Sequence, residues 1–125
     1  MINNYYQSWK RSKYGSKKAE CAHGHVHDSQ REACRCNELH ILQYCGELTD
    51  LQIQRKYVLI PAQRDESGKL VEYEVSYIAD FEYIENGEKV VEDNQSYARG
   101  ASYQLFSIKR KLMLYKFGIK VKELR

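Results

Sequence analysis

The sequence has a single proline in 125 residues, and no apolar run approaches the length of a membrane span. Because proline interrupts both helices and central strands, its scarcity favours long, continuous elements. The chain also starts without the basic and apolar segments of a signal peptide. We therefore expect a cytoplasmic protein with no membrane segment, whose four cysteines are reduced.

The cysteines are few, and their spacing is not that of a structural zinc site. Such sites usually draw on cysteine pairs about two to four residues apart at a knuckle. Cys34 and Cys36 fall in a predicted helix, where residues two apart point in different directions. His23, His25 and His27 alternate with small residues, so a strand would place them on one face. We interpret this segment as a short exposed turn or strand with incidental histidines, and we rank a zinc module last among the possible functions.

The net charge is small, +3, but it is unevenly distributed. Basic residues form one cluster near the N-terminus and another in the C-terminal third: Lys10, Arg11, Lys13, Lys17 and Lys18, then Lys109, Arg110, Lys111, Lys116, Lys120 and Lys122. Two basic clusters around an acidic centre favour a polyanionic partner. Residues 1–20 show no sustained period, which predicts a mobile basic arm followed by one domain over 21–125. An ordinary solvated terminus is the alternative for the arm.

The acidic centre contains the strongest local signal in the sequence, Asn86-Gly87 between two apolar runs. Both central positions of a two-residue hairpin turn take positive φ, which asparagine and glycine tolerate. With these residues as the loop, Glu85 faces Glu88, and successive pairs follow until Asp80 faces Asp93. The turn therefore fixes the register of the whole hairpin.

This register predicts that two carboxylates stand side by side on one face of a sheet. Like charges directly opposite destabilise a hairpin, whereas a divalent cation between them would turn repulsion into attraction. Gln95 returns to the same face, two residues after Asp93. We therefore predict a metal site at Asp80 and Asp93. Two alternatives stay open: acidic residues are common in exposed strands, and a β-bulge would shift the register and separate the pair.

A helix is predicted to begin after Ser29, because Ser29 and Glu32 have the spacing of a capping box. Gly46 is a suitable stop. The apolar contacts of this helix are expected from Leu39, Ile41 and Leu42. Glu32 has two interpretations of equal weight: it closes the first helical turn, or it reaches a metal as an extra carboxylate.

The remaining elements follow from apolar periodicity and turn residues. They are a strand over 52–61, a polar turn over 64–69, a strand from Val71 into Asp80, a connection over 96–100, a helix, and a last strand over 119–124. The second helix carries one apolar stripe that we expect to pack on the sheet: Leu105, Ile108, Leu112 and Tyr115. The order is arm, helix, three strands, helix and strand, an α/β (α+β) fold.

Five short segments match a known pattern in order and spacing: Lys13-Tyr-Gly-Ser-Lys-Lys18, Asp28-Ser-Gln-Arg-Glu-Ala33, Tyr77-Ile-Ala-Asp-Phe81, Val90-Val-Glu-Asp93 and Lys109-Arg-Lys-Leu112. Together they resemble the PD-(D/E)xK nuclease superfamily, and more narrowly a small phage-encoded family related to Holliday-junction resolvases. The resemblance covers Ser12 to Glu123. It implies a restriction-endonuclease-like αβββαβ core, with a mixed central sheet flanked by helices, and a site for Mg²⁺ that Mn²⁺ can occupy instead.

Carried over position by position, the resemblance implies Glu32, Asp80 and Asp93 as the acidic catalytic residues. The implied metal ligands are these three and a backbone carbonyl near Asn94. Gln95 stands where the family pattern has lysine, and an amide can hold a water but supplies no charge. Three explanations stay open: Gln95 suffices, a lysine arrives from the following helix (Lys109 or Lys111), or the chain has lost catalysis and only binds DNA.

The leading hypothesis is a Mg²⁺-dependent endodeoxyribonuclease of phage or prophage recombination, which acts on branched DNA in the cytoplasm of a bacterial host. The predicted phosphate contacts are Lys13, Lys17, Lys18, Lys109, Arg110 and Lys111. The resemblance also implies a homodimer, because two symmetric cuts need two sites. The alternative is a catalytically weak or inactive DNA-binding accessory protein of recombination with the same fold.

Overall fold

The computed structural model describes residues 18–95 and 99–125. The chain divides into two compact units, Met1–Thr49 and Asp50–Arg125. The predicted arm lies outside the described residues as far as Lys17, and its last two residues, Ala19–Glu20, form a strand. In the part of the chain that the structure describes, no helix is long and apolar enough to cross a membrane.

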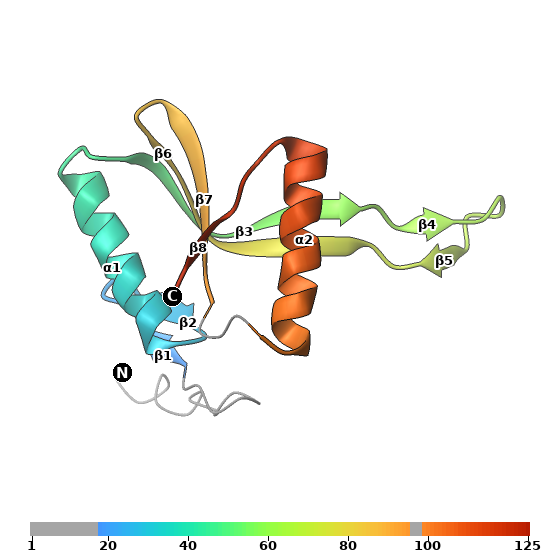
Figure 1. The fold of residues 1–125 in the computed structure, drawn as a ribbon, viewed down its shortest axis with the longest axis horizontal. Coiled ribbons are helices and arrows are strands. Elements are labelled where there is room, and N and C mark those ends of the chain that lie inside the picture. Colours follow the sequence, from blue (N-terminus) through green and yellow to red (C-terminus); the bar gives the residue numbers. More distant parts are fainter. Residues whose placement is uncertain (1–17, 96–98) are drawn as a thin grey trace. The chain divides into compact units, whose positions relative to one another are not determined.

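The first unit consists of two short strands and one helix (Figure 1). β1 (Ala19–Glu20) pairs antiparallel with β2 (Val26–His27). Gly24 in the connection has a φ of 82°, which glycine adopts without strain. α1 follows over Gln30–Tyr44.

The predicted limits of α1 are confirmed. The Ser29 hydroxyl caps the helix by accepting a hydrogen bond from the Glu32 backbone N–H at 3.1 Å, and Gly46 follows the last turn with a φ of 80°. Leu39 is buried as expected. The expectation for Ile41 is wrong, because Ile41 is exposed. It follows Leu39 by two positions, and residues two apart on a helix point to different faces.

A four-stranded sheet of order β3-β6-β7-β8 forms the centre of the second unit (Figure 1). The strands are β3 (Thr49–Ile60), β6 (Val75–Glu85), β7 (Glu88–Asn94) and β8 (Lys122–Leu124). β6 and β7 are antiparallel, whereas β7 and β8 are parallel, so the sheet is mixed. α2 (Ala101–Phe117) lies between β7 and β8 in the chain. This confirms the mixed α+β class and the predicted order of the long elements.

Beyond the sheet, the chain from β3 to β6 forms a small ribbon. β4 (Gln63–Arg64) pairs with β5 (Leu70–Glu72) around the predicted polar turn. Asp65 closes this turn by accepting hydrogen bonds from the backbone of Ser67 and Lys69. The prediction of one continuous strand from Val71 to Asp80 is wrong. The segment is divided between β5 and β6, and β5 pairs with β4 in a ladder whose register shifts between Gln63 and Arg64.

The hairpin turn is confirmed. Asn86 and Gly87 have φ angles of 53° and 78°, the positive pair that a tight two-residue turn requires. The ladder then runs in the predicted register from Glu85 opposite Glu88 to Phe81 opposite Glu92.

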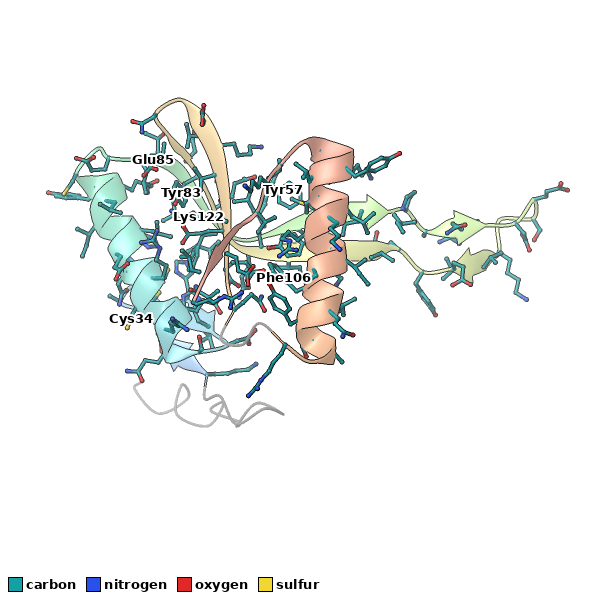
Figure 2. The ribbon with its side chains drawn as sticks, in the orientation of Figure 1. Cys34, Tyr57, Tyr83, Glu85, Phe106 and Lys122 are labelled. Atoms are coloured by element: carbon teal, nitrogen blue, oxygen red, sulfur yellow. The ribbon has the colours of Figure 1, made fainter. Side chains whose placement is uncertain are left out.

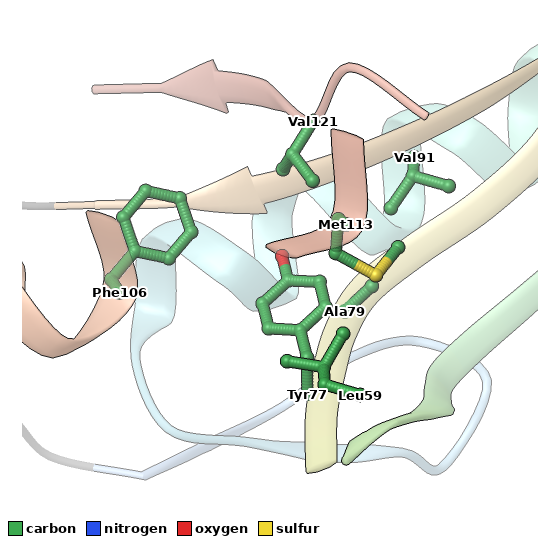
Figure 3. Close-up of a cluster of buried hydrophobic side chains, with 7 residues drawn as sticks. All are labelled: Leu59, Tyr77, Ala79, Val91, Phe106, Met113 and Val121. Atoms are coloured by element: carbon green, nitrogen blue, oxygen red, sulfur yellow. The ribbon is translucent and has the colours of Figure 1, made fainter. Parts of the chain in front are cut away.

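A buried cluster joins α2 to the sheet (Figure 3): Leu59, Tyr77, Ala79, Val91, Phe106, Met113 and Val121. Met113 is fully buried, whereas Tyr115 of the predicted stripe is 90% exposed, and Leu105 and Ile108 are exposed as well. The predicted stripe is therefore wrong for Leu105, Ile108 and Tyr115, whereas Leu112 packs against the buried cluster as expected. Apolar residues lie around most of this helix, so periodicity alone did not select the face that packs.

Candidate functional site

Asp80 and Asp93 come together at the end of the β6–β7 hairpin farthest from its turn. A side-chain hydrogen bond joins their two carboxyl groups. The backbone N–H of Asn94 also donates to Oδ2 of Asp80 at 2.8 Å. The structure thus brings together the acidic pair that the hairpin register predicted.

The pair meets without belonging to the ladder, whose last rung is Phe81 opposite Glu92. Ala79 belongs to the same buried cluster as Val91, although unbroken alternation from Phe81 would put Ala79 on the face opposite Val91. The alternation of β6 is therefore interrupted at Asp80, as in a β-bulge, which re-aims a side chain. The interruption does not separate the two carboxyl groups, contrary to the alternative interpretation of the sequence.

Asp93 is only 6% exposed. Burial raises the pKa of its carboxyl group above the ordinary value of 3.8, while hydrogen bonds from the side chains of Asp80, Tyr77 and Gln95 oppose that rise. Tyr77 donates its hydroxyl hydrogen to Oδ2 of Asp93 at 2.7 Å. Burial, then the charge of Asp93, raises the pKa of Tyr77, so the phenol stays a donor. A cation would relieve the cost of ionising this buried carboxyl group.

Gln95 contacts the pair from the position predicted for it. Its side-chain amide makes a hydrogen bond with the Asp93 carboxyl group, and its backbone N–H donates to the Leu124 carbonyl oxygen at 2.8 Å. Next to it, the side-chain nitrogen of Asn94 is buried and has no hydrogen-bond partner among the described residues. The Gln95 amide therefore lies where it can orient a ligand at the acidic pair.

Lys109 is half-buried and lines a hollow of about 320 Å³ beside Tyr77, whose hydroxyl group contacts Asp93. Lys111 is exposed on α2. The hypothesis that one of these two lysines replaces the family's lysine stays a prediction.

Sequence reasoning missed a third carboxylate, Glu123, which pairs with Asp93 in the parallel register of β7 and β8. Arg110 Nη1 lies 3.3 Å from Glu123 Oε2, and Arg125 Nη2 lies 3.0 Å from Glu123 Oε1. Two guanidinium groups therefore hold positive charge one strand away from Asp93. No local pattern indicates this arrangement, because the parallel pairing depends on the crossover through α2.

The predicted DNA contacts fall in several places. Lys13 and Lys17 lie outside the described residues, and Lys18 is exposed in the first unit. Arg110 and Lys111 line a hollow of about 530 Å³, which we call the basic hollow. Its cationic lining residues are Arg110, Lys111, Lys120 and Lys122, the last of which is labelled in Figure 2. Positive charge around a concave surface suits a phosphate-bearing ligand.

Glu32 lies in the first unit and is buried. The backbone N–H of Glu32 donates to the Ser29 hydroxyl, which confirms this half of the predicted capping box. The carboxylate of Glu32 instead contacts His27, with 3.1 Å between Oε1 and Nδ1. His27 is fully buried. The role of Glu32 as a ligand of the metal predicted at Asp80 and Asp93 stays a prediction.

The interpretation of residues 21–27 as an exposed segment is wrong for Cys21 and His27, which are both buried. Ligand atoms of Cys21, His25, His27 and Cys36 all lie within 4.8 Å of one another, and we call these residues the Cys/His cluster. The spacing in the sequence did not indicate this cluster, because α1 brings Cys36 to the β1–β2 connection only in three dimensions.

The two thiols of the Cys/His cluster differ in acidity. Burial raises the pKa of Cys21, but hydrogen bonds outweigh burial and lower this pKa to about 6. They come from His27, from the backbone of His23 and His25, and from Cys36. Burial, followed by the hydrogen bond and charge of Cys21, raises the pKa of Cys36 to about 12. Cys36 therefore donates to the Cys21 sulfur.

A family model described as DUF1064, a protein family of unknown function, matches residues 11–124. The match covers both the Cys/His cluster and the hairpin carboxylates. No curated protein and no solved structure matches the chain.

Proposed function

We propose that this chain, which belongs to the DUF1064 family, is a divalent-metal-dependent endodeoxyribonuclease of the PD-(D/E)xK type. The observation that carries the proposal is the contact between the carboxyl groups of Asp80 and Asp93, one half-buried and the other nearly fully buried. Two carboxylates in such contact repel each other unless they share a proton or a cation. The mixed sheet and the order of the long elements support a restriction-endonuclease-like core.

The donor set fits Mg²⁺ or Mn²⁺, which prefer carboxylate and carbonyl oxygens. Asp80 and Asp93 would hold the ion, and a backbone carbonyl near Asn94 is the further ligand proposed. The Tyr77 hydroxyl and the Asn94 N–H fix the orientation of the two aspartates. The ion, when bound, would supply the charge that polarises a scissile phosphodiester and favours ionisation of the attacking water.

Gln95 would orient the attacking water with its amide group, which already contacts Asp93. The positive charge that the family's lysine provides would come from neighbouring cations instead. Arg110 and Arg125 hold such charge at the register of Asp93, and Lys109 is the third candidate.

DNA is the proposed substrate because Lys111, Lys120 and Lys122 line the basic hollow and can contact backbone phosphates, beside the ion pair of Arg110 with Glu123. Phosphate contacts fix the orientation of a duplex without reading its sequence. We propose branched DNA, a role in phage or prophage recombination and a two-fold homodimer on the resemblance to Holliday-junction resolvases alone.

Gln95 also favours a second function. A chain that carries a neutral amide at this position could bind metal and DNA without cutting, as an accessory protein of recombination. Binding at an affinity similar to that of an active nuclease, with no product, would distinguish this function from the first.

The test is incubation of the protein with labelled Holliday junction, flap and plain duplex DNA in Mg²⁺ or Mn²⁺. We expect cleavage of a branched substrate, and we expect Asp80→Asn to reduce its rate by about 100-fold or more, because a ligand matters at least as much as its outer-shell partners. Glu88→Gln is the matched control, since it removes an exposed carboxylate from the same hairpin.

Gln95→Lys separates the two functions. Cleavage by the wild type that Asp80→Asn abolishes supports the nuclease. Tight DNA binding with cleavage only in Gln95→Lys identifies a disarmed nuclease with an accessory role. Absence of both DNA binding and cleavage in every form contradicts both proposals.

A further inference from the structure

The Cys/His cluster gathers two sulfur and two nitrogen ligands at one point of the first unit. Cys21 directly follows β1, His25 and His27 come from the β2 segment, and Cys36 comes from α1. Their ligand atoms lie within 4.8 Å of one another. In a tetrahedral zinc site with bonds of about 2.0–2.3 Å, ligand atoms lie roughly 3.3–3.8 Å apart, so a small contraction would suffice.

His25 is already directed at both sulfurs. Its Nδ1 lies 3.3 Å from Sγ of Cys21 and 3.7 Å from Sγ of Cys36. These distances fall in the range that two ligands of one tetrahedral ion would have.

His27 has the orientation that a zinc-bound histidine commonly has. Its Nδ1 lies 3.1 Å from the Glu32 carboxylate, and the ring also interacts with the Cys21 sulfur. Nδ1 therefore faces the carboxylate, and Nε2, the other ring nitrogen, would be the ligand atom. A carboxylate on the second nitrogen fixes the tautomer and orientation of metal-binding histidines.

We propose that Cys21, His25, His27 and Cys36 bind one Zn²⁺ as a structural site, with Glu32 as the residue that positions His27. Two thiolates and two imidazoles are a donor set that zinc prefers, and such closed sites stabilise the fold rather than act on substrates. The four proposed ligands include neither Asp80 nor Asp93 of the proposed nuclease.

Nδ1 of His40 lies 3.5 Å from Cys36 Sγ, but we exclude this atom as a zinc ligand. The same atom lies 2.8 Å from the backbone oxygen of Cys36, which fixes it as a donor. His40 instead stacks on His23 with a centroid separation of 3.8 Å, and it lies 5.7 Å from His25. His23 and His40 therefore stack next to His25, which belongs to the Cys/His cluster.

The first unit has little else to hold it together. The buried apolar side chains of its described part are Ala19, Cys21, Ala33, Cys36, Leu39 and Leu48. Units of this size rarely fold on such a core, and a bound metal or a disulfide commonly supplies the missing stability. All four cysteines are free thiols, so a metal is the cross-link that the structure accommodates without oxidation.

The test is the zinc content of the full-length chain, purified without chelators under reducing conditions and measured by mass spectrometry. We expect about one zinc per chain in the wild type and less than a tenth of that in Cys36→Ser. Cys34→Ser is the matched control, because Cys34 lies on the same helix two residues away and is exposed (Figure 2). It should keep its zinc.

A Co²⁺-substituted wild type keeps the test decisive if Cys36→Ser fails to fold. We expect intense visible d–d bands and sulfur-to-cobalt charge transfer from a tetrahedral site with two thiolates. Octahedral cobalt spectra, zinc-free protein that folds equally well, or a Cys21–Cys36 disulfide in protein purified under reducing conditions would each overturn the proposal.

Glu32→Gln tests the positioning residue. We expect the zinc affinity, measured by competition with a chelating dye, to fall about 10–100-fold. An unchanged affinity would overturn the role of Glu32.

Discussion

At the scale of single residues, burial, hydrogen bonding and charge act against one another at Asp93. Its burial raises the pKa of the carboxyl group, and the side chains that surround it are chiefly hydrogen-bond donors and a second carboxyl group, Asp80. A folded pKa above the unfolded one means that the folded state binds the proton more tightly. The stability that this proton provides is complete below the unfolded pKa and is lost as pH rises through the folded pKa.

Asp93→Asn should therefore remove a destabilisation that grows with pH. In the absence of divalent cations, we expect the free energy of unfolding of the wild type, relative to the variant, to fall as pH rises above about 3.8. Urea denaturation at a series of pH values measures this difference. Mg²⁺ should stabilise the wild type more at the higher pH values and should have little effect on the variant.

Asp65→Asn is a control of opposite sign. Hydrogen bonds, first that of Ser67, lower the pKa of Asp65 in the folded state, so its contribution is present above the unfolded pKa and is lost as pH falls. The unfolding free energy of the wild type relative to each variant should therefore change with pH in opposite directions. A change in the same direction for both variants would contradict the raised pKa of Asp93.

At the scale of elements, α2 decides which apolar residues form the core. Phe106 and Met113 pack in the buried cluster (Figure 3), whereas Tyr115 extends into solvent. Gly118, with a φ of 68°, ends the helix in the left-handed conformation that glycine adopts without strain.

Met113→Ala should destabilise the protein by about 2–5 kcal/mol, because it leaves a cavity in a packed core. Tyr115→Ala should change the free energy of unfolding by no more than about 0.5 kcal/mol. Chemical denaturation of the two variants makes the comparison. An equal loss of unfolding free energy in both variants would show that Tyr115 packs as closely as Met113, as the sequence predicted.

At the scale of the whole molecule, the distribution of charge matters more than the small net charge. The basic hollow gathers Arg110 and Lys111 of α2 with Lys120 and Lys122 of the segment that leads into β8. Such a surface should bind a polyanion with an affinity that falls steeply with salt.

Lys111→Ala and Lys120→Ala should each weaken DNA binding to a similar degree on different sequences. Each should also reduce the slope of log affinity against log salt by about 0.9, the value for one phosphate contact. Fluorescence anisotropy at several salt concentrations measures both quantities. Lys69→Ala, at the exposed turn of the β4–β5 ribbon, is the control and should leave the slope unchanged.

The sequence by itself determined the features that depend on neighbours in the chain. Asn86-Gly87 set the turn and the register of the hairpin, Ser29 set the start of α1, and Gly118 set the end of α2. Each of these rests on the backbone conformations that one or two residues permit, so a local pattern is sufficient.

Only the tertiary structure decided which distant residues meet. It selected Met113 rather than Tyr115 for the core, placed Glu123 at the register of Asp93, and brought Cys36 to Cys21. These contacts depend on how a helix rotates about its axis and on which strands become neighbours. Packing of the whole unit fixes both, and no short stretch of sequence contains that information.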